Sequence, residues 1–130
     1  MNHYFLAHGI RTHGETSIDA LAGPLTKLGN EVHDIPLAVR HTWSVRQTLQ
    51  RDANQLAAFL AGIHPFDRVI IGHSHGCHVA LRAAEQADCL AVWLFNPAVS
   101  SKYNMEFVKC GPERVFCVYS PEDWIVRVGA

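Results

Sequence analysis

The feature that most constrains the fold of this chain is one serine between two glycines, at the junction of two contrasting segments. Val69–Ile71 is a β-branched apolar run typical of a buried strand, and the sequence after residues 72–76 has the alanine-rich pattern of a helix that reaches about Ala87. Strand, tight turn and helix in this order place Ser74 at the apex of the turn. Glycines are needed on both sides because strand and helix approach closely there, and the strained turn lifts the serine above the sheet.

A serine hydroxyl becomes a nucleophile when it is exposed, lies next to a base and has donors nearby for the developing oxyanion. The turn supplies the exposure and one donor, because the His75 amide lies at the start of the helix. Amides in the first turn of a helix have no intrahelical acceptor, and the helix dipole favours negative charge there. We therefore predict that Ser74 is a nucleophile and that the His75 amide belongs to an oxyanion hole.

Hydrophobic patterns along the rest of the chain predict alternating strands and helices. Further strands are expected at Tyr4–Ala7, Glu31–Ile35, Leu90–Phe95 and Val115–Tyr119, and further helices from Thr16 or Ser17 to about Leu28 and from Val45 to Ala61. Residues 98–112 are interpreted as a loop or a broken helix. Strands alternating with helices favour a parallel sheet covered on both faces, and right-handed crossovers make it doubly wound. The prediction is an α/β fold with a mostly parallel five-stranded sheet, in one domain over residues 1–130.

Composition narrows the classes of partner and location. The chain has 130 residues, a net charge of −1 with neutral histidines and no run of like charge, which argues against nucleic acid and membrane surfaces as partners. No apolar run approaches the roughly 20 residues that cross a bilayer. The amino terminus lacks the pattern of a signal peptide, and the four cysteines lack C-x-x-C spacing, so we expect reduced thiols, mostly in the core. Together these observations predict a cytoplasmic protein.

Ligands of doubly wound sheets bind outside the carboxyl ends of the strands. The loops at those ends are residues 8–14, 72–76, 96–98 and 120–123. All four are expected to converge on one edge of the sheet, and this edge is the predicted site.

These loops together resemble the α/β-hydrolase fold family, with four matching segments in chain order. Phe5–Gly9 is similar to the family's first core strand and its His-Gly oxyanion loop, and Val69–Gly76 is similar to its nucleophile elbow. Leu94–Pro97 resembles the strand end after the elbow helix, and Ser120–Val126 resembles the loop that carries the acid of the catalytic triad. The resemblance covers nearly the whole chain and implies a sheet in which the strands stand in the order second, first, third, fourth, fifth.

The resemblance implies a role for each matching residue. Ser74 would be the nucleophile, and Asp123 would be the acid that orients a histidine. The amides of His75 and of Gly9 or Ile10 would form the oxyanion hole. The implied reaction is hydrolysis of a small-molecule ester, thioester or amide, without a cofactor.

The chain departs from the family in one respect. The family order is nucleophile, acid, histidine, and here the chain ends seven residues after Asp123, before such a histidine. Three interpretations remain open: the chain is part of a longer enzyme, His8 or His13 serves as the base, or the domain binds without turnover. The missing strands would also leave an apolar sheet edge, which would invite pairing with a second copy or a protein partner.

A different class of function is suggested by the histidines around the serine. His73, His75 and His78 form H-x-H-x-x-H after an apolar strand, which resembles the zinc cluster of the metallo-β-lactamase superfamily. Cys77 stands where that family has an aspartate, and the family's fold is rich in β-structure, whereas this chain alternates strand and helix. The sequence therefore favours the serine hydrolase over a zinc hydrolase.

Overall fold

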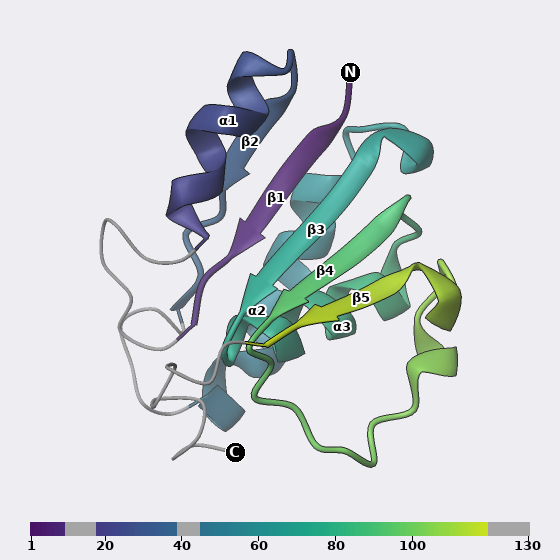
Figure 1. Cartoon of the computed structure of the whole chain (residues 1–130). Coiled ribbons are helices and arrows are strands. Elements are labelled where there is room, and N and C mark those ends of the chain that lie inside the picture. The colour runs from purple at the N-terminus through teal and green to yellow at the C-terminus, as the bar shows by residue number, and fades with distance from the viewer. Residues whose placement is uncertain (10–17, 39–44, 120–130) are drawn as a thin grey trace.

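A computed structural model describes residues 1–9, 18–38 and 45–119, and the sheet in it has the predicted topology (Figure 1). Five parallel strands stand in the order β2-β1-β3-β4-β5. The strands are β1 (His3–Ala7), β2 (Glu31–Asp34), β3 (Arg68–His73), β4 (Ala91–Phe95) and β5 (Val115–Val118). The helices are α1 (Ala22–Lys27), α2 (Val45–Leu60) and α3 (Gly76–Gln86). The predicted fold class is confirmed.

The helices cover both faces of the sheet (Figure 1). On one face, α2 and α3 pack against each other and against a core that includes Phe5, Ile70 and Leu81. On the other face, α1 lies over β2, and a smaller core gathers around Leu6 and Ile71. Neighbouring residues of β1 and β3 therefore pack into different cores, because successive side chains along a strand point to opposite faces of the sheet.

The central strand β3 is buried along its whole length, including a cation at its amino end. The Arg68 guanidinium donates hydrogen bonds to the carbonyls of Ile63 at 2.8 Å and Asp88 at 2.7 Å. Backbone acceptors thus compensate for the loss of water around this charge. A strand buried on both faces explains why Val69–Ile71 is uniformly apolar.

The helix expected from Thr16 or Ser17 is shorter than predicted. The expected caps lie outside the described residues, and a 3₁₀ turn at Asp19–Leu21 precedes α1. Pro24 then falls in the first turn of α1, where a proline is tolerated because its missing N–H would have no acceptor. The helix ends at Lys27, and the predicted stop at Gly29 follows its cap with φ of +88° and an Asn30 amide that donates to the Leu25 carbonyl at 3.2 Å.

The segment 98–112, for which the sequence left two structures open, is a loop that contains a 3₁₀ turn at Met105–Phe107. Val108 and Cys110 anchor the loop because both are buried against the core of α2 and α3. The Lys109 amide also donates to the Ala84 carbonyl of α3 at 3.0 Å.

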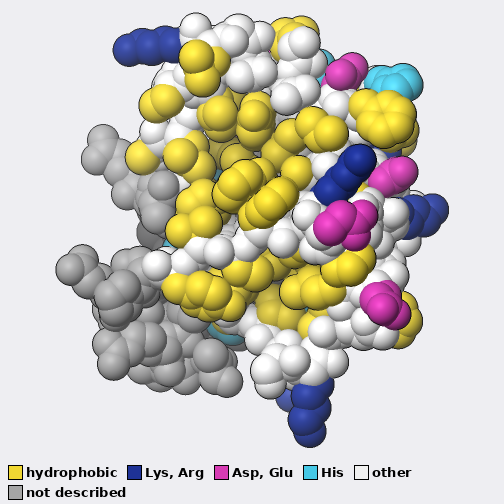
Figure 2. All heavy atoms as spheres, turned by 45° about the vertical axis from the view of Figure 1, so that its right-hand side comes forward, with side chains coloured by type: hydrophobic (Ala, Val, Ile, Leu, Met, Phe, Trp, Pro, Cys, Tyr) yellow, Lys and Arg dark blue, Asp and Glu magenta, His cyan; other side chains and the backbone are white. Residues whose placement is uncertain are grey.

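One face of β4 and β5 differs from the expectation of fully buried strands. Trp93 is 36% exposed and Phe116 is 40% exposed, and their rings stack with centroids 4.5 Å apart. Within the described residues, α1 contacts β2 at the far side of this face, and the main contacts of β5 are with β4. Figure 2 shows hydrophobic side chains gathered across this part of the surface. The described sheet therefore has an apolar edge at β5, as predicted.

Core packing around α3 yields a first prediction. Leu81 is fully buried, so Leu81→Ala should lower the free energy of unfolding by about 2–5 kcal/mol through lost burial and a residual cavity. The same substitution at Leu28, which is 78% exposed, should change it by less than about 0.5 kcal/mol. Urea unfolding of the two variants checks this, and equal losses would contradict the described core.

Candidate active site

Ser74 occupies the turn between β3 and α3 in a backbone conformation that few residues adopt. Its φ is +56°, in the left-handed region. Three backbone hydrogen bonds hold the turn: the Ser74 amide donates to the Phe95 carbonyl at 3.1 Å, and the Ser74 carbonyl accepts from Cys77 at 3.1 Å and from Ala98 at 3.2 Å. Because the end of β4 supplies two of these partners, the strained turn is fixed by the neighbouring strand as well as by its own helix.

Close backbone contacts explain the glycines of this turn. A Cβ on Gly72 would lie 2.8 Å from Cys77 Cα, and one on Gly76 would overlap the Ala7 carbonyl oxygen. Real Cβ atoms do not approach other atoms this closely. The second contact joins α3 to the end of β1, so Gly76 is required by the tertiary packing as much as by the turn.

The loop after β1 also packs against this turn. A Cβ on Gly9 would lie 2.8 Å from the Ser74 Cβ and 3.3 Å from the His75 amide nitrogen. Gly9 therefore packs directly against the serine and beside one predicted oxyanion donor. Two other predicted site residues, Ile10 and Asp123, lie outside the described residues.

The sequence predicted an exposed serine, but Ser74 is buried, because the Gly9 loop and α3 pack against it. Its hydroxyl has no hydrogen-bond partner in the described parts of the chain. A buried polar group without a partner costs about 1–3 kcal/mol. A residue that only filled space in this turn would not need a buried hydroxyl without a partner. Together with the positive φ, this makes Ser74 a candidate functional residue.

Within the described residues, no histidine forms a hydrogen bond with the Ser74 hydroxyl. His8 is fully buried at the end of β1, and its Nε2 lies 3.1 Å from Asp34 Oδ1 at the end of β2. This pairing joins the loop after β1 to the end of β2. His13, the other predicted base, lies outside the described residues.

Burial acts on two histidines close to the serine in sequence, His75 and His78. Partial burial lowers the pKa of His75 below its ordinary value. Burial and the nearby Arg82 also lower the pKa of His78. Both imidazoles therefore favour the neutral form near pH 7, because burial and a nearby cation disfavour the charged one.

The zinc cluster around the serine finds no support in the geometry. His73 ends β3, His75 lies in the turn and His78 lies within α3. Among the described residues, one group of His, Cys, Asp and Glu side chains brings three ligand atoms within 4.8 Å of one another, and it is His3, Glu31 and His33 at the amino ends of β1 and β2.

A cavity of about 240 Å³ opens between the loop after β4 and the strands β4 and β5, and Ser74 is not among its described lining residues. The segment 97–105 forms one wall, and Leu94 and Cys117, near the carboxyl ends of β4 and β5, form another. Pro97 lines it next to Ala98, whose amide bonds the Ser74 carbonyl. Sequence patterns did not identify these lining residues, because the segment has no hydrophobic period.

No protein-family model matches the sequence, and no curated protein matches it. Solved structures do match. A Trichoderma reesei cutinase in complex with a C11Y4 phosphonate inhibitor has a TM-score of 0.66 and 19% identity, over 99% of this chain and 64% of the cutinase. The ydeN gene product of B. subtilis has a TM-score of 0.67 and 18% identity, over 97% of this chain and 75% of that one. A protein assigned to the alpha/beta hydrolase superfamily from Xanthomonas campestris pv. campestris has a TM-score of 0.64 and 25% identity, over 92% and 71%.

These structures, with the strand order and the serine turn, establish the class: the chain has the fold of the α/β-hydrolase superfamily. The predicted resemblance is confirmed at the level of the fold. The chain spans less than two thirds of the cutinase it matches. In the described part of the chain, no helix is long and apolar enough to cross a membrane.

Packing at the turn yields a second prediction. Gly76→Ala should destabilise the protein by about 1–3 kcal/mol, because the new methyl group would overlap the carbonyl of Ala7 and push α3 away from β1. Gly23→Ala in α1 has open space around its Cβ and should stabilise by about 0.5–1 kcal/mol. Thermal unfolding of both variants measures the difference, and a neutral Gly76→Ala would refute the close approach.

Proposed function

We propose that the chain is a serine hydrolase that acts on a small-molecule ester, thioester or amide. The observation that supports this most strongly is the state of Ser74: a left-handed backbone at a strand–helix turn, with a buried hydroxyl that has no described partner. The likeness in fold to α/β hydrolases and a cutinase supports the same class of reaction.

In the proposed reaction, Ser74 Oγ attacks the carbonyl carbon of the substrate and transfers its proton to a base. The amides of His75 and Ile10 stabilise the oxyanion, a role that the packing of Gly9 against Ser74 supports. The base returns the proton to the leaving alcohol, thiol or amine, and water then releases the acid from the acyl-enzyme. Asp123 would orient the histidine that serves as base.

Whether a histidine serves as the base decides between this function and its alternative. His8 contacts Asp34, and no described histidine forms a hydrogen bond with Ser74. His8, His13 and a histidine from a longer chain remain the candidates. This observation favours, as the second proposal, a binding domain on the same fold with little turnover. Without a base, only the oxyanion hole and substrate binding would accelerate the reaction.

Labelling by a fluorophosphonate tests the serine directly. Wild-type protein should gain one adduct by intact mass and Ser74→Ala should gain none, because the phosphorus centre needs an activated hydroxyl. The related cutinase structure contains a phosphonate inhibitor, so the probe class suits the fold. Ser100→Ala, which removes an exposed serine of the neighbouring loop, should label like wild type. Absence of an adduct on the wild type would favour the binding domain.

We also propose that two copies of the chain pair through β5, in a cytoplasmic protein with no nucleic-acid or membrane partner. An edge strand has unpaired N–H and C=O groups, and the exposed sequence of β5 has no lysine or proline to discourage pairing. Pairing would also cover the exposed rings of Trp93 and Phe116.

Light scattering tests this pairing. Phe116→Lys should shift the population towards monomer by at least about tenfold in the dissociation constant, because it places a charge in the contact. Phe66→Lys introduces the same charge at another exposed phenylalanine and should leave the association unchanged. A wild-type protein that is monomeric at high concentration would overturn the proposal.

A further inference from the structure

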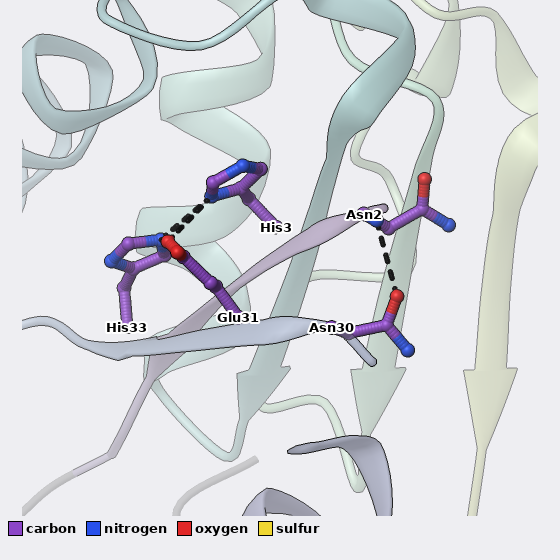
Figure 3. A network of polar contacts seen from close by, with 5 residues as sticks. All are labelled: Asn2, His3, Asn30, Glu31 and His33. Carbon is purple, nitrogen blue, oxygen red and sulfur yellow. Dashed lines mark hydrogen bonds and ion pairs between the residues drawn. The ribbon is translucent and has the colours of Figure 1, made fainter. Parts of the chain in front are cut away.

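A cluster of two histidines and a glutamate lies at the edge of the sheet opposite the serine turn (Figure 3). His3 belongs to β1, and Glu31 and His33 belong to β2. The register pairs His3 with Glu31, and residues two apart on a strand share a face, so the three side chains lie on one side of the sheet. Parallel strands place this cluster at their amino ends, whereas Ser74 follows the carboxyl end of β3.

The three side chains turn their ligand atoms toward one another, as the close-up shows. His3 Nδ1 lies 3.0 Å from His33 Nε2 and 3.3 Å from Glu31 Oε2, and His33 Nε2 lies 3.7 Å from the same oxygen. Tetrahedral zinc with bonds of about 2.0–2.2 Å requires its ligands to stand about 3.3 Å apart. A triangle with these sides has a point about 2 Å from all three atoms, which is the position of such an ion.

Neighbouring groups hold the cluster in this arrangement. The ring of Phe5 stacks on His33 with centroids 4.8 Å apart, and this contact limits the rotation of the imidazole. The Asn2 amide donates to Asn30 Oδ1 at 3.1 Å, and the Glu31 amide donates to the Asn2 carbonyl at 3.1 Å. These bonds fix the two strand ends together beside the ligands, as outer-shell contacts do in metal sites.

The exposure of the cluster suits an ion that enters from solvent. The His3 side chain is 14% exposed and the Glu31 side chain is 55% exposed, so one side of the triangle is open to water. Two neutral imidazoles and a carboxylate are zinc ligands, and a water molecule can supply the fourth. Without an ion, one of the two facing nitrogen atoms donates a hydrogen bond to the other, and zinc would displace the proton of that bond.

We propose that His3, Glu31 and His33 bind one divalent transition-metal ion, with zinc as the best fit, and that the ion fastens the edge strand β2 to β1. In the described sheet, β2 is a four-residue edge strand that pairs with β1. An ion shared between the two strands binds only when they are paired, so it stabilises the folded state. The site is structural, and its function does not depend on the reactivity of Ser74.

Zinc titration of tag-free protein, freed of metal by a chelator, tests the proposal. Wild type should bind one Zn²⁺ per chain, measured by competition with a chromogenic chelator, and its melting temperature should rise with zinc. His33→Ala should weaken zinc binding by at least about 100-fold, and Glu31→Gln, an exposed substitution that leaves the core untouched, by about tenfold. Zinc is used because copper and nickel, which accept square-planar nitrogen sites, can bind amino-terminal amines and amides.

Two controls separate this site from other histidines and from the serine. His64→Asn removes an exposed histidine and keeps an oxygen acceptor for the Phe66 amide, so zinc binding should match wild type. Ser74→Ala should also bind zinc normally. The proposal is overturned if the wild type binds no zinc, or if Glu31→Gln and His33→Ala bind it as tightly as the wild type does.

Discussion

The structure depends on the close approach of three glycines at one point. Gly76 brings α3 against the end of β1, Gly72 lets β3 pass the first turn of that helix, and Gly9 lies against Ser74. Any side chain at these positions would separate the elements that meet there. The approach places the His75 amide beside the β1 loop, and it holds Ser74 in its left-handed conformation. The same glycine contacts thus determine both the packing at this edge of the sheet and the geometry of the candidate site.

The sheet has different physical roles at its two edges. At the carboxyl ends, loops with special backbone conformations converge, and the strain at Ser74 and Asn96 is held by hydrogen bonds from β4 and β5. At the amino ends, side chains rather than backbone come together, and the register of β1 and β2 decides which ones. Parallel strands keep these two sets apart, so the proposed ion site and the serine turn lie at opposite ends of the strands.

The two faces of the sheet are covered unevenly by helices, and this leaves an apolar surface exposed on one face. On the face of α2 and α3, the core is continuous from Phe5 to Val92. On the opposite face, the apolar surface runs on to Trp93 and Phe116, whose rings shelter each other by stacking. Strands rich in apolar residues on both faces are typical of sheets with two covering layers. The exposed rings show where the described helices stop covering the second face.

The sequence by itself determined the fold class, the strand order through its resemblance, and the position of Ser74, because strand and helix periods and glycine turns are local signals. It also placed a stop at Gly29, since a left-handed residue ends a helix. Tertiary structure alone decided the rest. The partners of His8, the cavity beside Ala98 and the meeting of His3 with His33 join residues far apart in the chain. Such contacts depend on register and packing, which no local pattern encodes.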